Sequence, residues 1–153
     1  MPSKLRAKSY QLALKAMFQV PPEQIHEAIS KTLKGLQKSE SLQRAVSKLL
    51  VVDDAVLRQT VFGVDFPRPL GLAAGFDKAA IAPDCWGPIG FGYAELGTVT
   101  AKPQPGNDRP RLFRLKEDRA ILNRMGFNNP GAAAVAENLR ARRSDDVIGI
   151  NIG

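Results

Sequence analysis

Three side chains able to hold a ligand stand at or just past the ends of apolar runs that are typical of strands. They are Lys78, Thr98 and Asn151. An ammonium group can neutralise a phosphate, a carboxylate or an electron-rich ring, and an amide both donates and accepts toward a planar heterocycle. Because parallel strands end at one edge of a sheet, this pattern predicts a ligand site on that edge.

A second group of amides lies in segment 123–129, which holds Asn123, Asn128 and Asn129. Asparagine also suits turns and helix caps, so we expect Asn128 or Asn129 to cap the helix that follows. Asn123 lies too early for that role and is a candidate ligand contact. Asn151 sits in an apolar strand, where an unbonded amide is costly, so it is either a satisfied core amide or a ligand contact.

The elements that must position these residues follow from hydrophobic periodicity. The first third has apolar positions at helical spacing, and the remainder alternates strand-like and helix-like runs, which is typical of a parallel sheet with helical crossovers. The expected elements are helices near 10–18, 23–36, 42–50 (capped by Ser39 or Ser41), 79–89 and 128–143, strands at 61–66, 70–74, 93–96 and 147–152, and a hairpin at 111–115 and 120–122. Because no segment follows to cover the last strand, we expect an N-terminal portion of a longer α/β protein rather than a small complete domain.

The net charge of +7 is concentrated at the start of the chain. Residues 1–50 hold nine Lys/Arg against three Glu, which leaves +6. A basic, amphipathic segment suits an anionic partner, so its helices either lie on a membrane surface or pack on the rest of the protein, and both can hold. No apolar run reaches the roughly 20 residues that span a bilayer.

Other residue types exclude several classes of site. Cys85 is the sole cysteine, so an intramolecular disulfide is impossible, and we expect a reduced, cytosolic compartment and a buried, inert thiol. His26 is the sole histidine and lies in a helical segment, so a histidine-based acid–base mechanism is not available within these residues. The sequence has no metal-ligand spacing, and no metal is expected.

Two other functions are compatible with these patterns. Gly71 and Gly75 after a strand, with Glu95 at the next strand, weakly resemble a dinucleotide-binding turn, although the third glycine is missing. The basic helices would also suit a non-enzymatic membrane adaptor. Arginines at 109, 111, 114 and 119 could indicate nucleic-acid binding, but a hairpin with one solvated face explains the alternation more simply. No nucleic-acid partner is therefore expected.

Six strings are long and collinear with those of a known family. They are GLAAGFDK (71–78), ELGTVT (95–100), PQPGN (103–107), RPRLFR (109–114), NRMGFNN (123–129) and GINIG (149–153). Together they resemble the class 2, quinone-dependent dihydroorotate dehydrogenases, flavoenzymes of pyrimidine synthesis. Residues 1–50 are similar more loosely, through Pro22, Glu23 and His26.

The resemblance implies a TIM-type (β/α)8 barrel that holds FMN at its carboxyl edge. Residues 53–153 would supply about three of its eight strands, and residues 1–52 would form an amphipathic helical extension for quinone and membrane contact. The implied cofactor-binding residues are Ala74, Gly75, Phe76, Asp77, Lys78, Thr98 and Asn151. The implied substrate-binding residues are Lys78, Asn123, Arg124, Met125, Gly126 and Phe127.

The resemblance also implies an activity. The complete protein would oxidise dihydroorotate to orotate, pass hydride to FMN and then electrons to a membrane quinone, in the synthesis of UMP. The family's catalytic base is a serine expected beyond residue 153, so these residues alone should be inactive. The implied location is the cytoplasmic side of a bacterial cell membrane, as a peripheral protein whose residues 1–50 meet anionic lipid.

Overall fold

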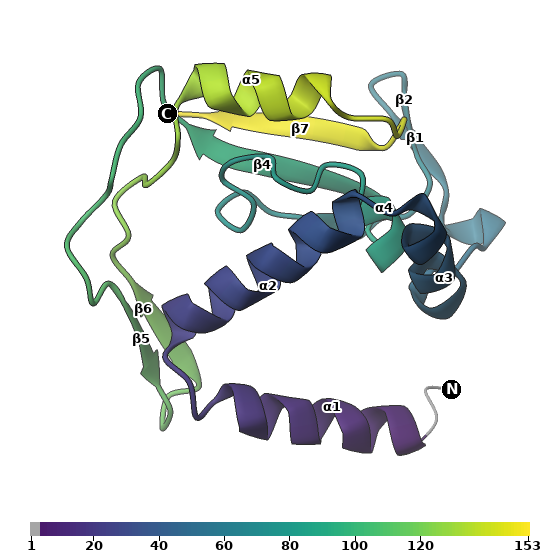
Figure 1. Cartoon of the computed structure of the whole chain (residues 1–153). Helices are drawn as coiled ribbons and strands as arrows, with labels where there is room; N and C mark the ends of the chain where they lie inside the picture. Colours follow the sequence, from purple (N-terminus) through teal and green to yellow (C-terminus); the bar gives the residue numbers. More distant parts are fainter. Residues whose placement is uncertain (1–3) are drawn as a thin grey trace. The chain divides into compact units, whose positions relative to one another are not determined.

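The computed structural model describes residues 4–153, with side chains described from Ala7 onward, and it divides into two compact units (Figure 1). The first, which we call the hairpin unit, comprises residues up to 29 together with 107–125. The second, which we call the sheet unit, comprises residues 30–106 and 126–153. Helix α2 begins in the hairpin unit and ends in the sheet unit.

The hairpin unit contains two helices and a β-hairpin. Two successive prolines, Pro21 and Pro22, separate the helices because proline suits only the first turn of a helix, and Glu23 in the first turn of α2 complements the helix dipole. The predicted hairpin is confirmed, with Leu112 opposite Asn123. The elements are α1 (Lys4–Met17), the first part of α2 (Pro22–Gln37), β5 (Leu112–Leu115) and β6 (Ala120–Asn123).

The arginines of this hairpin are not all on a solvated face, as the alternation predicted. Arg111 is 6% exposed, and its guanidinium contacts Oε1 of Glu23 through Nε at 2.9 Å and Nη2 at 2.8 Å. Arg114 donates to the backbone carbonyls of Met17 and Val20 and lies over the ring of Phe18. The prediction was wrong for Arg111 because a buried carboxylate across the unit, which periodicity does not reveal, neutralises its charge.

The sheet unit is built on three parallel strands in the order β3–β4–β7, with β4 in the centre (Figure 1). Gly71 pairs with Tyr93, and Tyr93 pairs in turn with Val147, so all three strands run in register from the same end. The strands are β3 (Gly71–Leu72), β4 (Tyr93–Val99) and β7 (Val147–Ile152). Strand β3 is shorter than the predicted 70–74, and β4 is longer than the predicted 93–96.

Helices and a small hairpin complete the sheet unit. Ser39 caps α3 as predicted, accepting a hydrogen bond from the backbone N of Leu42. The predicted strand 61–66 is instead a hairpin, because Phe62 and Gly63 both adopt positive φ and reverse the chain. The elements are α3 (Glu40–Leu50), the 3-10 turn η1 (Ala55–Leu57), β1 (Gln59–Val61), β2 (Val64–Phe66), α4 (Trp86–Ile89) and α5 (Ala132–Arg140).

The core of the sheet unit lies on one face of β4. Ala94, Leu96 and Val99 are buried there, as are Trp86 and Val135. The other face, with Tyr93, Glu95 and Gly149, lines an open hollow. The α/β class is as predicted, and the strands described do not close into a barrel. Cys85 is buried, as expected for an inert thiol.

Within the described part of the chain, no helix is both long and apolar enough to cross a membrane.

Candidate functional site

The carboxyl edge of the sheet unit joins the loop after β3 to the end of β4. The backbone N of Gly75 donates to the carbonyl of Gly97 at 2.7 Å, and the N of Gly97 donates to the carbonyl of Asp77 at 3.1 Å. Gly97 has φ +115°, and a Cβ there would lie 2.6 Å from the carbonyl oxygen of Asn151 on β7. Only glycine fits that backbone and that close approach, which brings Thr98 beside the loop 73–78.

Asp77 shapes this loop with its side chain. It is 3% exposed, and its carboxylate accepts from the backbone N of Ile81 at 2.9 Å and of Ala82 at 3.1 Å. Burial raises the pKa of Asp77 despite these bonds. Gly75, in contrast, has open space where a Cβ would stand and φ +106°, so its backbone is accessible to a ligand.

Lys78 reaches across the edge to the segment before α5. Its Nζ donates to Oδ1 of Asn128 at 2.6 Å. Asn128 is therefore not the helix cap that its position suggested. Asn129 instead stabilises the turn before α5, because its Oδ1 accepts from the N of Gly131 at 2.9 Å. Gly131, at φ +84°, is the N-cap residue of α5. The helix consequently begins at Ala132 rather than at residue 128.

Thr98, Asn151 and Glu95 form a chain of hydrogen bonds on one face of the sheet. Thr98 Oγ1 donates to Oδ1 of Asn151, and Nδ2 of Asn151 donates to Oε1 of Glu95 at 3.0 Å. Asn151 is thus a bonded amide whose orientation is set from both sides. Glu95 is engaged by Asn151, so the structure offers no support for its use as a ribose-binding acid.

Segment 123–127 is divided between the two units. In the hairpin unit, Oδ1 of Asn123 accepts from the backbone N of Met125 at 3.0 Å. Asn123 is exposed and Met125 is buried. Arg124 is exposed. In the sheet unit, Phe127 is 60% exposed and has φ +54°, a conformation that is uncommon for a bulky residue.

The edge of the sheet unit therefore brings together Lys78, Thr98 and Asn151, three of the residues that the sequence singled out. Their partners Asn128 and Glu95 were not predicted as parts of the site. Glu95 carried a signal, a carboxylate inside a largely apolar strand, which requires a partner. The edge offers a cation, a hydroxyl and an oriented amide, a set suited to an anionic, heterocyclic ligand. Among the described residues, no group of His, Cys, Asp and Glu could hold a metal ion.

Several known proteins are similar to this chain in sequence and in fold. Residues 56–153 match the family model described as "Dihydroorotate dehydrogenase". Proteins named "Dihydroorotate dehydrogenase (quinone)" from Corynebacterium diphtheriae and Corynebacterium striatum are 64% and 68% identical over 97% and 94% of this chain. The chain spans 41% and 40% of the length of these curated relatives.

Solved structures agree with the sequence comparison. A ligand-free DHODH from Eimeria tenella aligns with a TM-score of 0.71 and 39% identity, over 86% of this chain and 37% of that one. A second structure from the same organism, in complex with ferulenol, gives a TM-score of 0.68 and 38% identity. Those neighbours place the open three-stranded sheet within an α/β barrel family. The chain belongs to the dihydroorotate dehydrogenase family.

Proposed function

We propose that the whole protein oxidises dihydroorotate to orotate, with FMN as the first electron acceptor and a membrane quinone as the second, in the synthesis of UMP. The observation that carries this proposal is the identity of 64–68% to proteins named as quinone dihydroorotate dehydrogenases. The carboxyl edge of the sheet unit, which holds Lys78, Thr98 and Asn151 and which we call the ligand edge, supports the proposal. Its ammonium, hydroxyl and amide groups are suited to an anionic flavin and an anionic substrate.

The residues at the edge fit FMN. Gly75 offers open backbone, and the loop from Ala74 to Lys78 is held in shape by Asp77, whose side chain is engaged within the loop. Thr98 and Asn151 present a hydroxyl and an amide whose orientations are fixed by their mutual bond and by Glu95. Bound FMN would supply a hydride acceptor. The chain's own residues would bind and orient it, with Phe76 packing edge-on against Trp86 beneath the loop.

Lys78 and segment 123–127 would bind the substrate. Dihydroorotate carries a carboxylate, which an ammonium can neutralise, and Asn128 steadies that ammonium. Asn123 is the residue we assign to a direct hydrogen bond with the substrate ring. We also assign Arg124, Met125, Gly126 and Phe127 to substrate binding. The proton would be taken by a serine outside residues 1–153.

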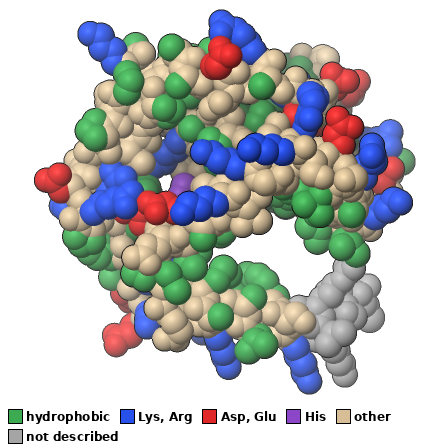
Figure 2. All heavy atoms as spheres, viewed as in Figure 1, with side chains coloured by type: hydrophobic (Ala, Val, Ile, Leu, Met, Phe, Trp, Pro, Cys, Tyr) green, Lys and Arg blue, Asp and Glu red, His purple; other side chains and the backbone are tan. Residues whose placement is uncertain are grey.

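Residues 1–52 would meet the quinone and an anionic lipid surface from the cytoplasmic side of a bacterial membrane, and residues 53–153 would form the first part of the barrel. Along α1, Tyr10 is 60% exposed and Leu12 71%, and Lys8 and Lys15 are also exposed; Phe18, directly after the helix, is 49% exposed. Figure 2 shows hydrophobic and basic side chains exposed together on this helix. Apolar burial with charge attraction is how amphipathic helices bind a membrane surface.

The proposal is tested on the full-length gene product. Purified protein should carry flavin absorbance, dihydroorotate should bleach it without oxygen, and a short-chain quinone should restore it. Protein that holds no flavin after incubation with FMN, or whose flavin dihydroorotate fails to reduce, would contradict the proposal. Binding to anionic vesicles without any such activity would instead favour a membrane adaptor.

A further inference from the structure

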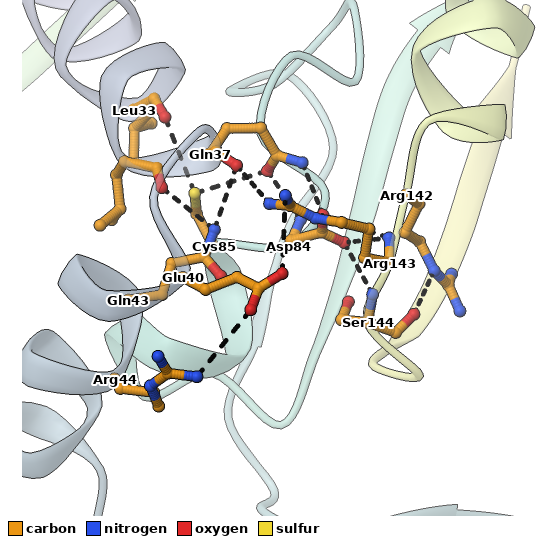
Figure 3. Close-up of polar contacts among 11 residues, drawn as sticks. Leu33, Gln37, Glu40, Gln43, Arg44, Asp84, Cys85, Arg142, Arg143 and Ser144 are labelled. Atoms are coloured by element: carbon orange, nitrogen blue, oxygen red, sulfur yellow. Dashed lines mark hydrogen bonds and ion pairs between the residues drawn. The ribbon is translucent and has the colours of Figure 1, made fainter.

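A hydrogen-bonded cluster joins four parts of the sheet unit: the end of α2, the start of α3, the loop before α4 and the connection between α5 and β7 (Figure 3). We name it the Asp84 hub, and it comprises Gln37, Glu40, Asp84, Arg143 and Ser144. Asp84 is 3% exposed, so its carboxylate depends on these neighbours for the hydrogen bonds that water would otherwise supply.

Gln37 and Asp84 bind each other in both directions. Nε2 of Gln37 donates to Oδ2 of Asp84 at 2.7 Å, and the backbone N of Asp84 donates to Oε1 of Gln37 at 3.0 Å. A side-chain amide supplies both the donor and the acceptor that this pairing needs. Because Gln37 is the last residue of α2, the pair fixes the end of that helix to the loop before α4.

The other oxygen of Asp84 binds the connection between α5 and β7. Oδ1 accepts from the backbone N of Arg143 and of Ser144, each at 3.0 Å. The Arg143 guanidinium reaches back, donating to the carbonyl of Gln37 at 2.6 Å and lying 3.8 Å from Glu40 in the first turn of α3. Burial alone would raise the pKa of Asp84, but the bonds from Ser144 and Arg143 outweigh it and lower the pKa.

The hub shares no residue with the ligand edge. None of its five members is among the residues that we assign to FMN or substrate, and its contacts run to helix ends and loops. Lys31 and Lys34 on α2, and Lys38 directly after it, are exposed close to Gln37 in sequence. Figure 2 shows basic side chains along the band that α2 occupies. The hub thus anchors a basic helical segment on the sheet that carries the ligand edge.

We infer that the Asp84 hub is a positioning device for the electron-acceptor side of the reaction. It holds the end of α2 and the start of α3 on the sheet, so that the helical segment meets the quinone in a fixed place. This inference rests on the proposed function, in which residues 1–52 meet the quinone and the sheet edge meets dihydroorotate. Loosening the hub should weaken the use of quinone and leave the reduction of flavin by dihydroorotate unchanged.

The two-way pair allows a test by exchange of polarity. In Gln37→Glu, a second carboxylate faces the carboxylate of Asp84. In Asp84→Asn, an amide nitrogen replaces the Oδ2 that accepts from Nε2 of Gln37, so two donors face each other while Oδ1 still accepts from Arg143 and Ser144. The double variant Gln37→Glu/Asp84→Asn restores one amide facing one carboxylate, with an Oδ1 still able to accept from Arg143 and Ser144. Arg140→Ala is the matched control, because it removes an exposed arginine of α5 that pairs only with exposed Glu137 among the described residues.

Three measurements on the full-length, FMN-loaded protein decide the question. We expect each single variant to raise the KM for a short-chain quinone at least tenfold, to keep the anaerobic rate of flavin reduction by dihydroorotate within twofold, and to speed amide hydrogen exchange in α3. The double variant should restore the KM and the exchange to within threefold of the parent. Arg140→Ala should match the parent in all three.

A parental quinone KM in both single variants would overturn the inference, as would equal losses in the two half-reactions or a double variant without recovery. If Gln37→Glu does not yield folded protein, Gln37→Met removes the pair without adding charge and carries the same expectation. A parent protein whose flavin dihydroorotate does not reduce would overturn the proposed function and the acceptor-side role with it. Exchange in α3 would then still show separately whether the hub holds the helix.

Discussion

Nζ of Lys78 lies 2.6 Å from Oδ1 of Asn128, so residues 50 positions apart in the sequence meet at the carboxyl edge of the sheet. The contact joins the loop after β3 to the segment before α5. Asn128 thereby holds the ammonium group at the edge where we place FMN and the substrate.

Asn128→Leu should lower kcat/KM for dihydroorotate about 10-fold to 100-fold in the full-length protein. A hydrogen bond to a charged group contributes roughly 1.5–3 kcal/mol, and about 1.4 kcal/mol corresponds to tenfold. Steady-state kinetics measure this, and Lys78→Met should lose at least as much. Asn138→Leu is the control, because Asn138 is an exposed amide that donates to the carbonyl of Ala79 and to no residue of the site. If Asn128→Leu kept the kcat/KM of the parent, Asn128 would have no role in the site.

Glu95→Leu should weaken FMN binding about tenfold, because Asn151 then loses the acceptor that orients its amide. Glu95→Gln keeps an oxygen acceptor at the same place and should stay within about threefold of the parent, which makes it the matched control. The fluorescence of FMN released on dilution measures the dissociation constant. Equal affinity in the parent and in Glu95→Leu would show that the chain from Thr98 to Glu95 does not orient a flavin-binding group.

Periodicity predicts the hairpin of β5 and β6 and the positions of β4 and β7, because alternating apolar residues mark the buried face of a strand. The prediction of a helix near 79–89 was wrong for residues 79–85, where alanines favour a helix. There the Asp77 carboxylate takes the amides of Ile81 and Ala82, and Ala80 adopts φ +51°. These features hold the segment in turns until α4 begins at Trp86.

Some residues of the candidate site can likewise be predicted from the sequence, and others cannot. Lys78 and Thr98 can be found from the sequence because each follows a predicted strand and carries a polar group at a predicted sheet edge. Asn128 and Glu95 cannot be assigned as their partners from local pattern, because a hydrogen bond between distant residues depends on the register and the loops of the folded sheet. Arg111 is a further case, since its burial depends on a carboxylate in α2.

Arg111→Met should destabilise the full-length protein by about 3 kcal/mol. Breaking a buried ion pair by removing one partner costs roughly 3–5 kcal/mol, and the lower figure applies because Arg109 stays 3.2 Å from Glu23. Arg109→Met should cost under about 1 kcal/mol, since that side chain is 60% exposed. Urea unfolding with constant m-values measures both. Equal losses in the two variants would contradict the importance of the buried pair.

Cys85 should resist alkylation in the folded protein. Burial, with Asp84 and Asp77 nearby, raises the pKa of its thiol from 9.0 to about 12, so the thiolate fraction at pH 8 falls on the order of a thousandfold. Iodoacetamide labelling followed by mass spectrometry should show slow modification of folded protein and fast modification in denaturant. Equal rates in both conditions would mean that the loop before α4 opens readily.

The contributions of Asp84 and Asp146 to stability should change with pH in opposite directions, although each carboxylate accepts backbone hydrogen bonds in the sheet unit. Burial raises the pKa of Asp146, so its contribution is fully present below its ordinary pKa and is lost as pH rises through the raised value. The pKa of Asp84 is lowered because hydrogen bonds outweigh burial. Its contribution is therefore present above its ordinary pKa and is lost as pH falls through the lowered value.

Asp146→Asn should consequently match or exceed the parent in urea midpoint at pH 7, because it removes a charge that burial disfavours while keeping an acceptor for the N of Gly87. Asp84→Asn should lower the midpoint at pH 7, and its deficit should shrink as the pH falls below the ordinary carboxyl range, near 3.8. Unfolding curves across pH 3–8 for the two variants and the parent measure both trends. A loss of stability in Asp146→Asn as large as that in Asp84→Asn at pH 7 would mean that the two carboxylates stabilise the fold in the same way.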